Sequence, residues 1–100
     1  MFKFEKQWKL NFKGHEIIVE NWWDIILRTG ERLIIDGNIT DEHNGLLGLS
    51  QKLEGQIKSN EQVHHVEVKL GSIDLGLKSG CHIYIDGNLV GGDITKKIIT

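Results

Sequence analysis

The 100-residue chain contains no alanine, only one cysteine and no long hydrophobic run. Without alanine, and with Ile, Leu, Val and Gly abundant, the composition favours half-buried strands joined by tight turns over helices. Cys81 has no second cysteine with which to form an intrachain disulfide, and this favours a reducing, cytoplasmic location. No stretch approaches the roughly 18 apolar residues of a membrane span, and no apolar segment of a signal peptide is visible.

Charge also excludes several classes of partner. The formal net charge is −2 and the Lys and Arg residues are spread along the chain. A chain without a basic stripe is not expected to bind nucleic acid or an anionic membrane surface. The length, with 39% hydrophobic and 26% charged residues, predicts one globular domain over residues 1–100.

A repeated segment organises the chain. Asp24–Thr40 returns fifty positions later as Asp74–Val90 without a gap. The identical pairs are Asp24/Asp74, Leu27/Leu77, Gly30/Gly80, Ile35/Ile85, Asp36/Asp86, Gly37/Gly87 and Asn38/Asn88. This self-similarity predicts an internal duplication, with repeats of approximately 2–45 and 46–92.

Alternation of apolar and polar residues predicts the first strands. The even positions of Phe2–Phe12 are mostly apolar, which is typical of a strand with one buried face. Lys13-Gly14 then predicts a turn, and alternation from His15 onward predicts a second strand. Read through without interruption, that strand would span about 14 residues, so we expect a break or bulge near Asn21–Trp23.

Glycines mark the expected turns and irregularities. Thr29-Gly30 predicts a tight turn, and Asp36-Gly37 predicts a type I′ hairpin turn because both central residues of that turn need positive φ. The polar segment Thr40–Gly45 predicts a loop. Gly48 and Gly55 predict a bulge or a close backbone approach.

Four strands in each repeat complete the expected fold. The strand that begins at His64 echoes the one at His15 at an offset of forty-nine rather than fifty. We therefore expect a one-residue indel at the bulge or in the Gly71-Ser72 turn, because a slip within a strand would reverse its faces. The prediction is an all-β, two-sheet antiparallel β-sandwich of about eight strands, with a partly closed β-barrel as the alternative.

Several motifs occur in an order that resembles the C-terminal β-sandwich of the Fas apoptotic inhibitory molecule family. They are Trp8, Gly14-His15-Glu16-Ile17, Gly30-Glu31-Arg32, Ile35-Asp36-Gly37, Leu53-Glu54-Gly55 and Ile83-Tyr84-Ile85-Asp86-Gly87. The segment Asn21–Thr29 is longer and more apolar than the family pattern. The resemblance implies a non-enzymatic, cytosolic protein-interaction domain, and it carries over no catalytic residue.

We expect structural roles for the histidine, aspartate and cysteine residues that could carry out chemistry. His64 and His65 are adjacent, so on a strand they point to opposite faces and cannot share a metal ion. His15 and His64 occupy matching positions and are expected to pack, while Asp36 and Asp86 are expected to serve their turns. Cys81 is expected to be buried. We therefore predict no catalytic residue, no metal site and no cofactor.

Function is expected where the two repeats differ. Trp23 is assigned to the core, whereas Trp22 on the opposite face could be an exposed anchor beside Asp24. The loop around His43 is the other candidate, since loops on a rigid scaffold often bind ligands. The predicted binding residues are Trp22, Asp24 and His43. The leading hypothesis is a protein-interaction or assembly module, with self-association possible, and the alternative is a small-ligand or carbohydrate-binding sandwich that uses Trp22.

Overall fold

The computed structural model describes residues 3–26, 28–46, 51–73 and 78–94. Strands account for almost all of these residues, as the composition predicts. They are β1 Lys3–Phe12, β2 His15–Asp24, β3 Arg28–Ile35, β4 Asn38–Leu46, β5 Gln51–Ser59, β6 Gln62–Ile73, β7 Lys78–Ile85 and β8 Asn88–Gly92. The described residues include no helix long and apolar enough to cross a membrane.

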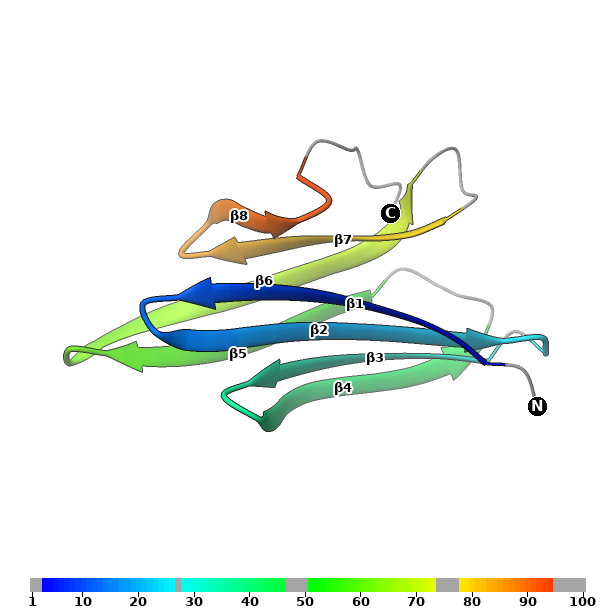
Figure 1. Ribbon diagram of the computed structural model, residues 1–100, viewed down its shortest axis with the longest axis horizontal. Coiled ribbons are helices and arrows are strands. Elements are labelled where there is room, and N and C mark those ends of the chain that lie inside the picture. The colour runs from blue at the N-terminus through cyan, green and yellow to red at the C-terminus, as the bar shows by residue number, and fades with distance from the viewer. Residues whose placement is uncertain (1–2, 27, 47–50, 74–77, 95–100) are drawn as a thin grey trace.

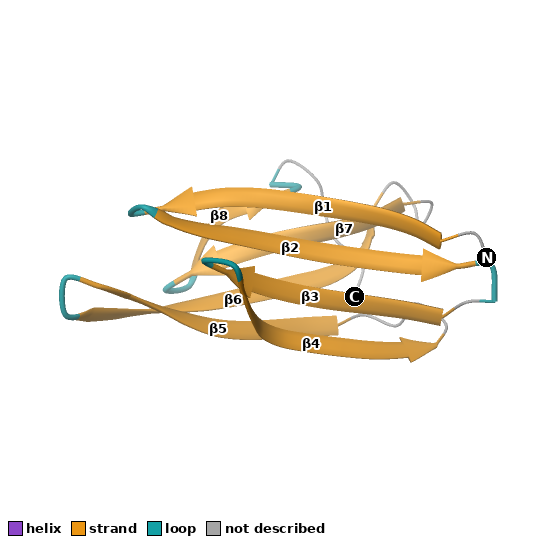
Figure 2. Ribbon diagram, turned by 60° about the horizontal axis from the view of Figure 1, so that its bottom comes forward, coloured by secondary structure: helices purple, strands orange, loops and turns teal. Residues whose placement is uncertain are grey.

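The strands form two four-stranded antiparallel sheets. Sheet A has the order β1-β2-β3-β4 and sheet B the order β5-β6-β7-β8, so every pairing joins strands that are consecutive in the chain. The two sheets lie one over the other (Figures 1 and 2). The predicted all-β, two-sheet architecture is confirmed. In the pairing of the described strands the sheets remain separate, so the alternative of a partly closed barrel is wrong.

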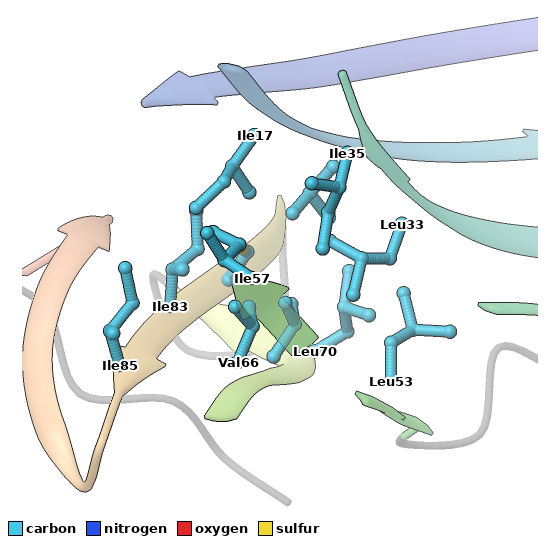
Figure 3. Packing of buried hydrophobic residues seen from close by; sticks show 12 residues of the cluster. Ile17, Leu33, Ile35, Leu53, Ile57, Val66, Leu70, Ile83 and Ile85 are labelled. Carbon is cyan, nitrogen blue, oxygen red and sulfur yellow. The ribbon is translucent and has the colours of Figure 1, made fainter. Parts of the chain in front are cut away.

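Aliphatic side chains between the sheets make the core. Side chains of Ile17, Leu33 and Ile35 from sheet A point toward those of sheet B (Figure 3). The whole buried cluster is Ile17, Val19, Leu33, Ile35, Leu53, Ile57, Val66, Val68, Leu70, Cys81, Ile83 and Ile85. Complete burial of one such aliphatic side chain stabilises a fold by about 1.5–3 kcal/mol. The period-2 alternation in the sequence follows directly from this one buried face per sheet.

The two sheets approach each other closely where a glycine of sheet B faces a larger side chain of sheet A. A Cβ on Gly55 of β5 would lie 2.7 Å from Thr40 Cγ2 of β4, and one on Gly91 of β8 would lie 3.2 Å from Leu10 Cδ2 of β1. The atoms nearest to Gly55 belong to side chains of sheet A and not to a backbone, and β5 pairs with β6 without a bulge, so neither form of the prediction for Gly55 is confirmed. Gly48 lies outside the described residues.

Two-residue turns join β1 to β2, β3 to β4, β5 to β6 and β7 to β8. In the Asp36-Gly37 turn the φ angles are 51° and 80°, as a type I′ turn requires. Positive φ also occurs at both residues of Lys13-Gly14, Asn60-Glu61 and Asp86-Gly87. The four turns lie at the same end of the sandwich (Figure 1).

The predicted break in the second strand is wrong. β2 runs from His15 to Asp24 and pairs with β1 in one continuous register through Asn21–Trp23. The chain turns later, at residues 25–26. β3 begins at Arg28, so Thr29-Gly30 is not a turn but lies within a strand.

The predicted polar loop Thr40–Gly45 is wrong as well. It belongs to β4, which pairs with β3 as an edge strand of sheet A. An edge strand keeps one side and one face in water, so a run of polar residues is compatible with it. β4 nevertheless carries an irregularity, because Leu33 pairs with Asp41 and Ile34 with Ile39, which leaves Thr40 as a bulge.

The two sheets share these details of register. Ile17 pairs with Ile35 in sheet A, and Val66 pairs with Ile85 in sheet B. The offset is therefore 66 − 17 = 49 between β2 and β6, but 85 − 35 = 50 between β3 and β7. The connection between β6 and β7, residues 74–77, is one residue longer than the connection between β2 and β3, residues 25–27. The extra residue therefore lies neither at Asn21–Trp23 nor at Gly71-Ser72, where it was expected. It follows that Trp22 corresponds to Gly71.

Candidate functional site

Each sheet contains a histidine–aspartate pair at the end with the hairpin turns. His15 Nδ1 lies 2.6 Å from Asp36 Oδ2, and His64 Nδ1 lies 2.6 Å from Asp86 Oδ2. The second oxygen of each carboxylate accepts a backbone N–H at 2.9 Å, from Glu16 in one sheet and from His65 in the other. Each aspartate therefore bonds its hairpin turn to the neighbouring strand, which is β2 in sheet A and β6 in sheet B.

The carboxylates owe their acidity to these bonds. The hydrogen bond from the paired histidine, followed by the backbone N–H, holds the pKa of Asp36 and of Asp86 below the ordinary value. The pairs differ in exposure, because the His64 side chain is 10% exposed and that of His15 28%. His64 packs edge-on against Phe12, with 5.1 Å between ring centroids. This geometry supports structural roles for all four residues.

Asp24 holds the turn between β2 and β3. Its Oδ1 accepts the backbone N–H groups of Ile26 and Arg28 at 3.1 and 3.0 Å. Its Oδ2 accepts the guanidinium Nε–H of Arg28 at 2.7 Å. Burial opposes ionisation of the carboxyl, but these bonds outweigh it and lower the pKa of Asp24. The predicted binding residue thus uses its carboxylate to shape a turn.

His43 lies on β4, directly opposite Glu31 of β3. Glu31 is 4% exposed, and its Oε2 has no hydrogen-bond partner among the described residues. Burial raises the pKa of Glu31 to about 7, although the nearby His43 acts in the opposite direction. His43 is exposed and lies 3.5 Å from Asp41 Oδ1 through its Nε2. It belongs to an edge strand rather than to a loop.

Trp22 lies on the outer face of sheet A, where it is partly buried. It pairs across the strands with Gly30. A Cβ on Gly30 would overlap the Trp22 indole at Nε1 and lie 2.5 Å from its Cε2, and it would lie 2.8 Å from Asn44 Oδ1. Gly30 is therefore a glycine because the indole occupies the place of a side chain.

Trp23 has the opposite orientation but is not part of the buried core, so its assignment to the core is wrong. It stacks on Phe4 of β1, with 5.8 Å between ring centroids and 17° between ring planes. Phe4 is 50% exposed. The pair lies near one end of sheet A, where the described residues give it less cover than the core receives.

A row of polar side chains crosses the outer face beside Trp22. Gln7 Nε2 donates to Glu20 Oε2 at 2.9 Å. Arg32 lies 3.5 Å from Glu20 Oε1 through Nη1, and its Nε donates to Glu42 Oε2 at 2.6 Å. The four residues come from β1, β2, β3 and β4 in turn. We call this set the polar row.

A hollow of about 310 Å³ lies between Trp22 and the polar row. That volume is at the lower end of the range for small-molecule sites. Its lining residues are Glu5, Lys6, Gln7, Glu20, Asn21, Trp22 and Arg32. Of the three predicted binding residues, Trp22 alone lines the hollow. Asp24 is the last residue of β2, beside the β2–β3 turn, and His43 lies on the edge strand β4.

A second cluster lies on the outer face of sheet B. Potential ligand atoms of Glu54, His65 and Glu67 all lie within 4.8 Å of one another. Lys52 Nζ lies between the two carboxylates, 3.4 Å from Glu54 Oε1 and 3.2 Å from Glu67 Oε2. Because this ammonium group already balances the paired carboxylates, we propose no metal site here.

Cys81 is buried and free, as predicted. Burial, reinforced by the Asp93 carboxylate, raises the pKa of its thiol far above the ordinary value. A thiol that does not ionise is a poor nucleophile. The residue therefore acts as a small core side chain.

The class that this geometry defines is a two-sheet antiparallel sandwich with matched hairpin turns. No family model, curated protein or solved structure matches the chain. The side-chain geometry is therefore what supports a function.

Two features of these surfaces escaped the sequence patterns. Glu31 alternates with Leu33 and Ile35, so its inward orientation could have been recognised from the period of two. The polar row could not, because it joins positions on four strands and depends on their register. Register between strands is set by the fold rather than by any local motif.

Proposed function

We propose that the chain is a non-catalytic interaction module that binds a protein partner through one apolar end of sheet A. The observation that supports this is the exposure of large apolar side chains there. Phe4 is 50% exposed, Ile25 66% and Ile26 55%. Together with Trp23, which stacks on Phe4, these residues form what we call the apolar end.

The apolar end lies opposite the four hairpin turns. β1 begins there and β2 ends there, close to the N-terminal end of the described chain (Figure 1). Soluble proteins expose single apolar residues freely, whereas adjoining ones mark interaction surfaces. Aromatic residues are enriched in the centres of such surfaces.

The β2–β3 turn gives this surface a fixed shape. Asp24 accepts hydrogen bonds from Ile26 and Arg28 within the turn, so the backbone that carries Ile25 and Ile26 is held in place. A surface that is ordered before binding loses less entropy when a partner is bound. Four residues cover little area, which suits a transient partner better than a permanent dimer.

Other observations support the remaining parts of the proposal. Asp36, Asp86 and Cys81, the residues with most potential for chemistry, are accounted for by turns and core packing. A free, buried cysteine suits the cytoplasm. The matched turns, bulges and His–Asp pairs of the two sheets support an origin by internal duplication.

The test compares three proteins: the unchanged chain, the double variant Phe4→Ser/Ile26→Ser, and the control Ile39→Ser. Ile39 is 57% exposed and lies beside the Asp36-Gly37 turn, away from the apolar end. Ile39→Ser therefore removes exposed apolar surface from a different part of the molecule. Each protein is checked for folding by thermal melting. Each is then used for affinity capture with quantitative mass spectrometry and for sedimentation velocity.

We expect a partner protein that the unchanged chain and the control retain and the double variant loses. Concentration-dependent association that follows the same pattern would identify a second copy as the partner. Identical captured proteins for all three, or monomers without any specific partner, would overturn the proposal.

A further inference from the structure

The hollow beside Trp22 is separate from the apolar end and has a different character. Trp22 and Trp23 are neighbours on β2, so their side chains leave the sheet on opposite faces. Trp23 stacks on Phe4, whereas Trp22 borders a space whose other walls carry carboxylate, amide and guanidinium groups from residues such as Glu20, Gln7 and Arg32. The hollow is therefore suited to a different ligand from the partner of the apolar end.

The walls of the hollow are held in place by their own contacts. The Trp22 indole rests over Gly30, because no side chain is present there to displace it. On the other side Glu20 accepts a hydrogen bond from Gln7 and faces Arg32, which is bonded to Glu42. Groups fixed before a ligand arrives bind it with a smaller entropic cost.

The corresponding place on sheet B has none of these groups. The pairings that align Gln7, Glu20 and Arg32 in sheet A align Lys52, Lys69 and His82 in sheet B. The Trp22–Gly30 pair corresponds to Gly71 and Gly80. Both sheets fold with the same strand order, so the fold does not require this combination of side chains.

The charges on the lining indicate the class of ligand. The Lys6 ammonium lies over the Trp8 ring on the inner face and does not enter this balance. On the outer face Glu20 pairs with Arg32, and Arg32 also with Glu42, so these charges already have partners and do not call for an ionic ligand. The aromatic ring offers an apolar surface with a polar edge. The amide, carboxylate and guanidinium groups can donate hydrogen bonds to a ligand and accept them from it.

We propose that the hollow binds a neutral polyhydroxylated ring, namely a saccharide residue. The C–H face of the sugar stacks on the Trp22 indole. Its hydroxyl groups bond with Gln7, Glu20 and Arg32 of the polar row. The hydroxyls replace water at these side chains without introducing a charge that would have to be neutralised.

The test uses the three tryptophan indole N–H signals in a nitrogen-15 NMR spectrum, with Trp22 assigned from the Trp22→Phe variant. The probes are neutral trisaccharides of glucose, xylose, mannose and N-acetylglucosamine, with galacturonate and inorganic phosphate as charged probes. We expect one or more neutral trisaccharides to shift the Trp22 signal in a saturable way and to leave the Trp23 signal in place.

Variants separate stacking from hydrogen bonding. Trp22→Ala should weaken saccharide binding at least 10-fold, and Gln7→Ala and Glu20→Gln several-fold each. Trp23→Ala is the matched control and should bind as the unchanged chain does. If Trp22→Ala does not fold, the Gln7 and Glu20 variants test the same site through backbone shifts of Gly30 and Arg32.

The proposal is overturned if no neutral trisaccharide shifts the Trp22 signal, if only the charged probes do, or if Trp23→Ala loses binding while Trp22→Ala retains it. Failure of this site is distinguishable from failure of the apolar end. Phe4→Ser/Ile26→Ser should lose the protein partner and keep the saccharide, and Trp22→Ala should do the reverse.

Discussion

Glu31 and His43 face each other across the β3–β4 pair, yet only His43 is exposed to solvent. The buried carboxyl has a pKa of about 7, because burial disfavours its charged form more than the facing histidine favours it. In the unfolded chain the carboxyl ionises near its ordinary value of 4.5. Between these two values the folded protein binds more protons than the unfolded chain.

Stability should therefore fall as pH rises from about 4.5 to 7, and the loss should be complete above that range. A difference of about 2.5 pH units corresponds to about 3 kcal/mol. Glu31→Gln removes the charge. Above pH 7 we therefore expect the variant to be more stable, with a free energy of unfolding up to about 3 kcal/mol higher than that of the unchanged chain. Urea denaturation at several pH values measures this. The exposed Glu16→Gln is the control, and parallel pH curves for all three proteins would contradict the prediction.

Asp36 and Asp86 predict the opposite dependence at acid pH. Their pKa values are lowered in the fold by the histidine and backbone bonds. The stability that these carboxylates contribute is present above their unfolded value of 3.8 and is lost as pH falls through the folded values. Asp36→Asn/Asp86→Asn should be less stable at pH 7 and lose less stability between pH 4 and pH 2.

Circular dichroism during acid titration measures this change. Glu61→Gln serves as the control, because Glu61 lies in a turn and is exposed. An acid transition of the double variant as steep as that of the unchanged chain would show that the pairs do not contribute in this way.

Gly30→Ala should destabilise the fold by about 1–3 kcal/mol, because the new methyl group overlaps the Trp22 indole. Combining it with Trp22→Ala removes the overlap, so the double variant should lose less than the two single changes added together. Thermal and urea denaturation of the four proteins measure the coupling. Gly45→Ala is the control, since a Cβ there meets no atom within 4 Å. Additive losses would mean that the indole does not require a glycine opposite it.

Gly37→Ala should cost about 1 kcal/mol, because φ at this position is 80° and a side chain is strained there. No neighbour within 4 Å would contact the added Cβ, so the cost isolates backbone conformation. Gly37→Asn is the matched comparison and should cost less, since asparagine tolerates this region. Equal losses for the two variants, measured by urea denaturation, would point to another cause.

The strands and the hairpin turn at Asp36-Gly37 could be predicted because their signals are local. Alternation reports a buried face within one strand, and a type I′ turn needs a particular pair of residues. Thr29-Gly30 was misread because a glycine within a strand looks like a turn until the Trp22 ring across from it is known. The segment Thr40–Gly45 was misread because an edge strand does not need to alternate.

The candidate site was only partly accessible from the sequence. Trp22 was identified because it breaks the similarity between the repeats. Asp24 was placed beside it, but its carboxylate serves the backbone of the next turn, and no sequence pattern reported this. Gln7 and Arg32, which line the hollow with Trp22, come from other strands, and their convergence depends on the register of two pairings.

The pairing of consecutive strands has a consequence for how the chain folds. Every pair of hydrogen-bonded strands in the two sheets is consecutive in the chain. Each strand pair can therefore form without first closing a long loop. Chains dominated by nearby contacts fold faster than those with distant ones. Folding of this chain should therefore be fast for an all-β sandwich.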